Sequence, residues 1–213
     1  MVAPRAHSGG LAALYWTGLA LLLPVTERLT APPCAFDRAW LDGAARLRSV
    51  RLDGFFLAIT WAGSLYLLLP ATLAAIGWLM RRRRWSDARL LGLSLAGASA
   101  IAHGMKPLFG RARPDLYPPL VPVPADASFP SAHAAQITAC VVAVLVLRVG
   151  GKYASWAASA GITLAAAVGL SRVYLQVHYA SDVAAGVLLA LFWVLGLEAL
   201  LKALSRPGRS SGM

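Results

Sequence analysis

Long apolar stretches, each close to the length that crosses a bilayer, recur along the chain and constrain its fold more than any other feature. A transmembrane helix needs about 20 mostly apolar residues. Hydrophobic residues make up 58% of the chain and charged residues only 14%, whereas a soluble domain carries about 25% charged residues. We therefore expect an all-α, polytopic membrane protein with six transmembrane helices. The stretches are Leu11–Val25, Phe55–Met80, Leu90–Phe109, Ser131–Leu147, Tyr153–Ser171 and Tyr179–Leu200.

A single membrane-embedded domain is expected over residues 1–205, because the length suits one domain and no internal repeat is visible. Residues 206–213, rich in Ser, Gly and Arg, predict a disordered tail. Between the first two spans, residues 36–54 interleave apolar and charged positions, which predicts an amphipathic helix on the outer surface. Leu11–Val25 is also short enough for a signal-peptide core, so its retention stays open. The apolar face of the surface helix would hold Trp40, Leu41, Ala44, Ala45, Leu47 and Val50.

Basic residues in short loops predict the orientation in the membrane. The run Arg81–Arg84, with Arg89, lies between the second and third stretches, and such runs favour the cytoplasmic side. With six spans, both termini are then cytoplasmic. The segment Glu27–Asp53 would lie outside although it contains five arginines and four acidic residues. We base the predicted orientation on the compact four-arginine run.

The formal net charge of +11 needs an anionic partner. The arginines lie in short loops between apolar stretches, so anionic lipid headgroups suit them. No face combines aromatic and basic residues in the way that base stacking requires, and we expect no binding of nucleic acid. The predicted partners are the membrane bilayer and a lipid.

Polar residues at the outer ends of four predicted spans are the candidates for a functional site. Charged and histidine side chains at membrane depth are costly and usually functional. Under the predicted topology, three separate segments converge on the outer face of the membrane. They contribute Lys106, Arg111 and Arg113, then Ser131 and His133, and finally Arg172, His178 and Asp182.

These residue types suit phosphoryl transfer. Guanidinium groups match the oxygens of a phosphate, and Ser131 is a candidate N-cap whose following amides, at Ala132 and His133, form an anion site at a helix N-terminus. His178 and Asp182 are four residues apart, so on a helix they share a face and the carboxylate holds one imidazole nitrogen. His133 can protonate a leaving oxygen and then activate water.

Each of these residues also has an ordinary explanation when taken alone. Lys106 or Arg113 can snorkel to the interface, His133 can be a polar cap, and His178 with Asp182 can be a structural pair. A further histidine, His103, is expected to be buried and satisfied. Gly63 and Ser64 are expected to be helix-packing residues, and Tyr174, Tyr179 and Trp193 interface or packing aromatics.

Three segments together resemble the signature of the type 2 phosphatidic acid phosphatase superfamily. They are Lys106-Pro-Leu-Phe-Gly-Arg-Ala-Arg113-Pro114, then Pro130-Ser131-Ala132-His133, then Ser171-Arg172 followed by His178 and Asp182. Ala132 stands where the family usually has glycine, but its amide is retained. The resemblance covers about residues 36–200.

The resemblance implies a six-helix membrane core, a nucleophilic His178 oriented by Asp182, and an acid/base His133. The phosphate would be bound by Lys106, Arg113, Ser131, Arg172 and the backbone at Ala132, with no metal or other cofactor. The implied substrates are lipid phosphates or diphosphates: phosphatidate, phosphatidylglycerol phosphate, undecaprenyl diphosphate or lipid A.

The expected function is therefore a lipid phosphatase that works through a phosphohistidine, in a bacterial plasma (inner) membrane with its site on the periplasmic side. A membrane phosphotransferase using the same intermediate stays open, as does a non-enzymatic anion or lipid transporter. Vanadium haloperoxidases share a similar oxyanion pocket, but they are soluble. The particular lipid and the oligomeric state stay open as well.

Overall fold

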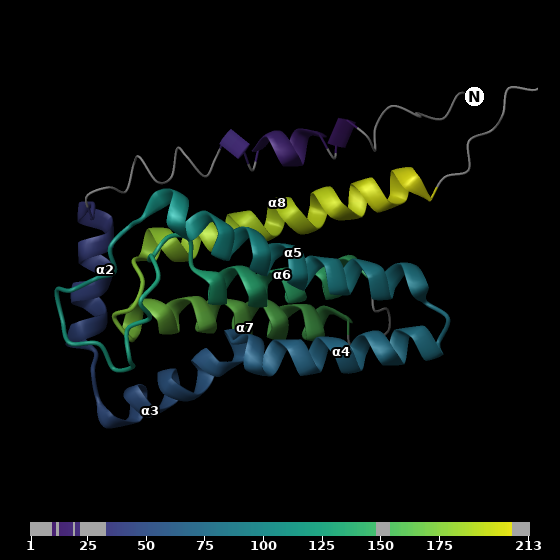
Figure 1. Cartoon of the computed structure of the whole chain (residues 1–213). Coiled ribbons are helices and arrows are strands. Elements are labelled where there is room, and N and C mark those ends of the chain that lie inside the picture. Colours follow the sequence, from purple (N-terminus) through teal and green to yellow (C-terminus); the bar gives the residue numbers. More distant parts are fainter. Residues whose placement is uncertain (1–9, 12, 19, 22–32, 148–153, 206–213) are drawn as a thin grey trace, which may run out of the picture.

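The computed structural model describes residues 10–11, 13–18, 20–21, 33–147 and 154–205. All regular secondary structure in these ranges is helical, which confirms the all-α prediction. The long helices form a bundle, and α2 lies across one end of it (Figure 1). The order is α2 (Ala35–Arg46), α3 (Val50–Ile59), the 3-10 helix η1 (Thr60–Gly63), α4 (Leu65–Arg81), α5 (Trp85–Phe109), α6 (Ala132–Val146), α7 (Ala154–Tyr174) and α8 (Ala180–Leu204).

Helix α6 occupies the centre of the bundle and contacts α4, α5, α7, α8 and η1. Its buried side chains are mostly alanines, and small residues let helix backbones approach closely. At Gly186 in α8, an added Cβ would lie 2.5 Å from the carbonyl oxygen of Ser131. Only glycine fits there, so α8 is held tightly against the start of α6.

Two of the described helices are long and apolar enough to cross a membrane, Ser155–Tyr174 and Ala180–Leu204. A third span results if Val50–Gly63 and Leu65–Arg81 are taken together. Helix α6 is apolar but shorter. The prediction of apolar membrane helices is thus confirmed in part, and the full set of six stays a prediction. Parts of the first and fifth predicted spans, and the predicted tail 206–213, lie outside the described residues.

The second predicted stretch, Phe55–Met80, is not one continuous helix. The chain bends by 46° between η1 and α4. Ser64 adopts an extended backbone and caps α4 by accepting a hydrogen bond from the Tyr66 amide at 3.2 Å. Gly63 is a packing residue, as expected, because a Cβ there would meet Val168 and His133. Serine and glycine leave the apolar character of the stretch unchanged, so hydropathy did not reveal the break.

The predicted surface helix over 36–54 is wrong in extent. Helix α2 ends at Arg46, and α3 begins at Val50 after Ser49, whose side chain accepts a hydrogen bond from the Leu52 amide. Of the predicted apolar face, Leu41 is fully buried but Val50 is 91% exposed. The first-turn carboxylate of α2, Asp37, is also fully buried, so this helix turns a charged residue toward the protein.

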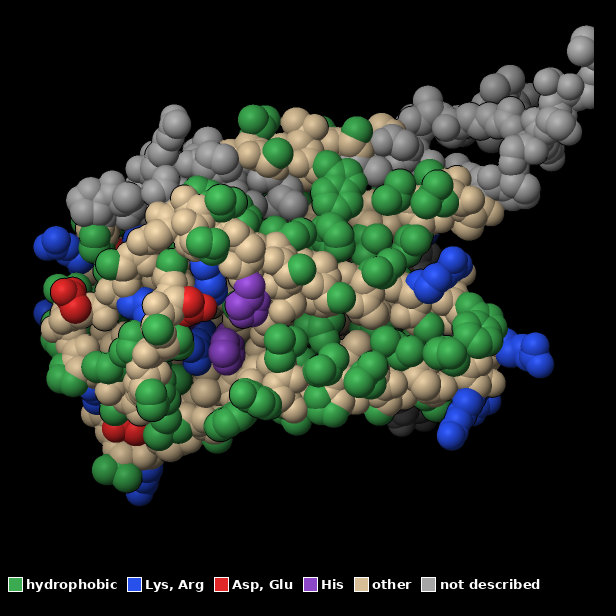
Figure 2. All heavy atoms as spheres, in the orientation of Figure 1, with side chains coloured by type: hydrophobic (Ala, Val, Ile, Leu, Met, Phe, Trp, Pro, Cys, Tyr) green, Lys and Arg blue, Asp and Glu red, His purple; other side chains and the backbone are tan. Residues whose placement is uncertain are grey.

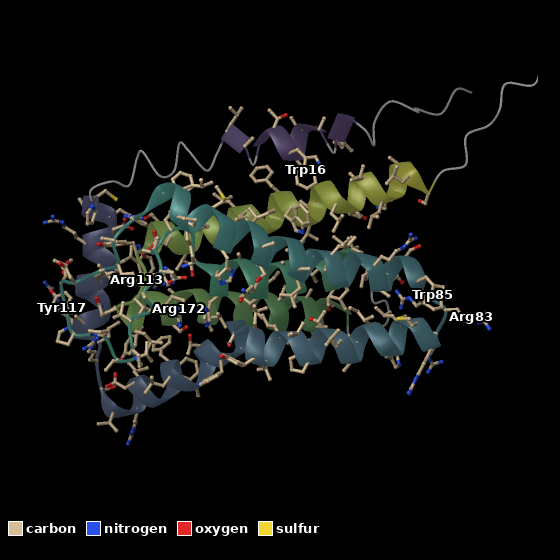
Figure 3. The ribbon with its side chains drawn as sticks, in the orientation of Figure 1. Trp16, Arg83, Trp85, Arg113, Tyr117 and Arg172 are labelled. Atoms are coloured by element: carbon tan, nitrogen blue, oxygen red, sulfur yellow. The ribbon has the colours of Figure 1, made fainter. Side chains whose placement is uncertain are left out.

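The described part of the first stretch is helical and packs along α8. The ring of Trp16 meets that of Trp193 edge-on at 4.9 Å, and Tyr15 lies 6.3 Å from Phe192 between ring centroids. Figure 3 shows Trp16 beside α8. Trp193 is therefore a packing residue, and its indole N–H also donates to the carbonyl oxygen of Leu93.

The two ends of the bundle carry different groups. Arg83 and Trp85 lie at one end, whereas Arg113, Arg172 and Tyr117 lie at or near the other (Figure 3). Hydrophobic side chains make up much of the visible face between the ends (Figure 2). The predicted site and the Arg81–Arg84 run are therefore separated by the length of the helices.

Candidate active site

All predicted site residues come together at the end of the bundle covered by α2. Figure 2 shows basic, acidic and histidine side chains gathered on this part of the visible face. They come from the end of α5, the connection 110–131, the start of α6, the end of α7 and the start of α8. Most are buried: Lys106, Ser131, Ala132, Arg172, His178 and Asp182.

Glycine at the end of α5 turns the chain into the site. Gly110 has a left-handed backbone with φ 59°, and its amide donates to the Lys106 carbonyl at 2.9 Å. Glycine adopts this conformation without steric cost and commonly ends helices in this way. The turn is followed at once by Arg111, which is buried at 8% exposure, and then by Arg113.

His178 lies in the connection between α7 and α8, so the helical face predicted for it and Asp182 is wrong. The amides of Val177 and His178 both donate to the Arg172 carbonyl at 3.2 Å, and Gln176 takes a left-handed φ of 61°. This tight turn folds His178 back over the end of α7. The predicted pair forms nevertheless, with Nδ1 of His178 3.4 Å from Oδ2 of Asp182.

The contacts of His178 define its protonation. A guanidinium N–H of Arg113 lies 3.2 Å from Nε2 and can only donate, so Nε2 accepts and Nδ1 carries the hydrogen that faces Asp182. Burial lowers the pKa of His178 to about 4, although the hydrogen bond to Asp182 opposes that shift. The ring is therefore neutral at pH 7, with a lone pair on Nε2.

Asp182 is the centre of a buried hydrogen-bond network. Its carboxylate accepts from Arg111 at 2.5 Å, from the Tyr179 amide at 2.9 Å and from the Ser128 hydroxyl. Its carbonyl accepts from the Ser131 amide at 3.0 Å, which links α8 to the N-terminus of α6. These bonds fix the carboxylate that faces His178.

Arg111 extends this network to α2. Its guanidinium donates to Asp37 at 2.8 Å and to the Ser181 hydroxyl at 2.8 Å. Asp37 also accepts from the amide and hydroxyl of Ser181. The aromatic ring of Tyr179 lies under the guanidinium at 4.2 Å. Arg111 is one of the polar residues expected at the outer face, but the sequence predicted no role for it or for Asp37, Ser128 and Ser181.

Two buried donors in the site have no hydrogen-bond partner among the described residues. They are the hydroxyl of Ser131 and Nε of Arg172. Arg172 also donates from NH1 to Thr60 at 2.7 Å. Ser131 is the N-cap residue of α6, as predicted, but its side chain makes no capping bond. Unpartnered buried donors are costly, and both suit the oxygens of a bound anion.

A carboxylate occupies the space between the two other cations. Asp126, which lies in the connection 110–131, accepts from Arg113 at 2.6 Å and lies 3.0 Å from Nζ of Lys106. No role was predicted from the sequence for this carboxylate. Partial burial raises the pKa of Asp126, but the hydrogen bonds from Arg113 and Lys106 outweigh that effect and lower it. Asp126 is therefore ionised and lies between two of the predicted phosphate ligands.

His133 is half-buried at the start of α6, next to Gly63 of η1. It lies in the first turn of α6, one residue after Ala132 and two after Ser131, which are predicted phosphate ligands. His103, predicted to be buried, is exposed, and its Nδ1 bonds the Ser99 carbonyl at 2.8 Å.

No group of three or more His, Cys, Asp or Glu residues suited to a metal ion occurs in the part of the chain that the structure describes. The side chains that converge with the two histidines are mainly basic. This arrangement can bind a multiply charged anion and attack it with a neutral imidazole.

Comparison with known proteins gives the family. The model of the PAP2 superfamily matches residues 87–205. Decaprenylphosphoryl-5-phosphoribose phosphatase of Mycobacterium tuberculosis is 42% identical over 125 residues, which cover 57% of this chain and 64% of that protein. The match thus spans slightly less than two thirds of that relative. Phosphatidylglycerophosphatase B of Bacillus subtilis is 32% identical over 177 residues, covering 78% of this chain and 85% of that protein.

A solved structure agrees with these relatives. The transmembrane PAP2-type phosphatidylglycerolphosphate phosphatase of Bacillus subtilis superposes with a TM-score of 0.76 at 25% identity. The superposition covers 91% of this chain and 98% of that one. With a family model that matches more than half of its residues, the chain belongs to the PAP2 superfamily.

Proposed function

We propose that this protein is an integral membrane phosphatase that hydrolyses the phosphate of a lipid headgroup through a phosphohistidine. The observation that carries the proposal is the geometry around His178. A neutral imidazole has its Nδ1–H toward a fixed carboxylate and its lone pair on Nε2, which accepts a hydrogen bond from Arg113 at 3.2 Å. The relatives, which are named as phosphatases of lipid-linked phosphates, support the same substrate class.

In the first step, Nε2 of His178 attacks phosphorus and the bond from phosphorus to the ester oxygen breaks. His133 donates a proton to that oxygen, so the lipid leaves as an alcohol. Lys106, Arg113 and Arg172 balance the charge of the phosphoryl oxygens. The Ser131 hydroxyl and the Ala132 amide at the N-terminus of α6 add hydrogen bonds to them.

In the second step, His133 takes a proton from water and the resulting nucleophile attacks phosphorus. The bond between Nε2 and phosphorus breaks, and inorganic phosphate leaves while His178 returns to its neutral form. Asp182 holds Nδ1–H throughout and stabilises the positive charge that the ring carries in the intermediate. The fixed cations supply the charge stabilisation that a metal gives in other phosphatases, so the reaction needs no metal or cofactor.

The proposed membrane arrangement has six spans, with α3, η1 and α4 forming a bent second span. Both termini lie in the cytoplasm of a bacterial inner membrane, and residues 1–205 form one domain. The Arg81–Arg84 run lies at the opposite end of the bundle from the site, which supports a periplasmic site under the positive-inside rule. Helix α2 then lies on the outer surface. Alkaline phosphatase fusions after Arg83 and after Asp115 test this orientation, with activity expected only for the second.

The test of function is a turnover panel with the purified protein in one detergent. Phosphatidate, phosphatidylglycerol phosphate, undecaprenyl diphosphate and a lipid A preparation are each assayed for phosphate release, with and without EDTA and vanadate. We expect release from at least one lipid, unaffected by EDTA and inhibited by vanadate, which mimics the transition state. His178→Ala should abolish turnover, whereas Arg89→Gln, at the far end of the bundle, should retain it.

Trapping of the intermediate separates the proposed enzyme from a transporter. Brief incubation with a lipid labelled in its terminal phosphate should leave label on the protein that is stable to alkali and lost in acid. The absence of both label and phosphate release, with retained lipid binding, would indicate an anion or lipid transporter. Glycerol added to the trapped intermediate distinguishes hydrolysis from phosphotransfer by the formation of glycerol phosphate.

A further inference from the structure

A stripe of polar residues on α5 continues from the phosphate-binding cations into the membrane-spanning part of the bundle. Ser99, His103 and Lys106 follow one another at helical spacing, so they lie along one side of α5. The Ser99 hydroxyl accepts from the amide of Gln136 in α6 at 3.0 Å. This bond turns the stripe toward α6. Along α5, His103 lies between Lys106 and this contact with α6.

The hydrogen bond of His103 fixes its tautomer. Nδ1 lies 2.8 Å from the Ser99 carbonyl oxygen, which can only accept, so Nδ1 carries the hydrogen. In a neutral ring, Nε2 is then an acceptor. No hydrogen bond to Nε2 is found within the described ranges. His103 therefore presents an acceptor on the exposed side of α5.

A proline one turn further along provides a second acceptor at the same place. Pro107 has no N–H, so the carbonyl oxygen of His103 lacks the usual helical donor four residues ahead. His103, Gly104 and Pro107 are all exposed. A Cβ at Gly104 would meet nothing within 4 Å, so the space beside these acceptors is open. Nε2 and the carbonyl oxygen of His103 can therefore both accept a hydrogen bond from a bound molecule.

We propose that His103 forms a leaving-group subsite that accepts a hydrogen bond from a hydroxyl of the lipid headgroup. The rise from Lys106 to His103 is about 4.5 Å along the helix, a distance that a hydroxyl on the carbon next to the phosphate-bearing carbon can span. The substrate class is then a lipid whose phosphate sits on a hydroxylated unit, such as glycerol or a sugar. Phosphatidate and undecaprenyl diphosphate have no such hydroxyl. This inference rests on the proposed phosphatase function.

The test measures wild-type protein and one His103 variant on two lipids that differ in a single hydroxyl. Phosphatidylglycerol phosphate is compared with its analogue built on propane-1,3-diol, which lacks only the glycerol hydroxyl. Wild-type protein should have about tenfold higher kcat/KM on the hydroxylated lipid, the effect of one hydrogen bond. His103→Leu should lose about the same factor on that lipid and leave kcat/KM on the analogue unchanged. If the substrate hydroxyl and the His103 side chain share one hydrogen bond, removing both should lower kcat/KM no more than removing either one alone.

Two further variants keep the test independent of folding. His103→Gln retains a side-chain acceptor and should recover part of the preference for the hydroxylated lipid. Ala100→Leu, also exposed on α5, is the matched control and should behave as wild type on both lipids. Equal losses on both lipids for His103→Leu, or no loss on either, would overturn the subsite. Failure of the wild-type protein to release phosphate from any lipid would instead overturn the proposed function and the subsite with it.

Discussion

The substitution Asp37→Asn tests whether α2 supports the active site through Arg111. Arg111 lies between two carboxylates, at 2.8 Å from Asp37 and 2.5 Å from Asp182. Asp37 and Asp182 have no exposed surface, and Arg111 is 8% exposed. Asparagine keeps the shape of the side chain but removes its negative charge. The change therefore acts on the electrostatics of the network and leaves its packing intact.

The expected loss of stability is large for a single substitution. Removing one partner of a buried ion pair costs about 3–5 kcal/mol. Here the low end, about 3 kcal/mol, applies because asparagine can still accept from the Ser181 amide, which now bonds Asp37 at 2.9 Å. A chain of this size changes its Tm by about 2–4 °C per kcal/mol, so a decrease of about 6–12 °C is expected.

Thermal unfolding in detergent and steady-state kinetics provide the assay. Because Asp37 does not contact the phosphate ligands, kcat should fall about tenfold with little change in KM. Asp42→Asn is the matched control on the same helix, since Asp42 is only partly buried and accepts a hydrogen bond from Tyr117 at 3.0 Å. If Asp37→Asn unfolds at the wild-type temperature with wild-type kcat, the supporting role of α2 is refuted.

Three further predictions concern the site itself. Since burial lowers the pKa of His178 to about 4, the acidic limb of the kcat/KM profile should lie near pH 4; a limb near pH 6.5 would contradict a neutral buried nucleophile. Asp126→Asn should lower the inhibition constant of inorganic phosphate about threefold to fivefold, because a partly exposed competitor is removed. Gly186→Ala should reduce stability by about 1–3 kcal/mol, by crowding the Ser131 carbonyl. Gly77→Ala is the control and should not reduce stability, because a Cβ there would meet nothing within 4 Å. Equal losses of stability for the two variants would refute the close contact at Gly186.

The candidate site residues could be selected from the sequence because their spacing is local. Lys106 and Arg113, or His178 and Asp182, are separated by a few residues, and each type is costly at membrane depth unless it has a partner or a task. The family resemblance then joined the three segments. Their convergence at one end of the bundle also followed from the alternation of the predicted spans.

The supporting network was not predictable, because its contacts are distant in sequence. Asp37 and Arg111 are 74 residues apart, and Ser128 and Asp182 are 54 apart. In an amphipathic segment an aspartate is normally assigned to the polar face, so nothing local marked Asp37 as buried. Likewise, the exposure of His103 depends on how α5 packs against its neighbours, which the pattern of apolar residues does not define.

The charges of the network explain why a second carboxylate is needed behind Arg111. Arg111 and Asp182 alone would neutralise each other, and the proposed cationic intermediate on His178 would face a pair with no net charge. Asp37 supplies the second negative charge, so the group of three carries a net charge of −1 next to His178. In the proposed mechanism the phosphoryl transfer places positive charge on the ring, so this net charge would stabilise the intermediate more than the neutral ground state. Under the proposed mechanism, the helix that lies across the end of the bundle therefore contributes to the chemistry, and the kcat of Asp37→Asn measures that contribution.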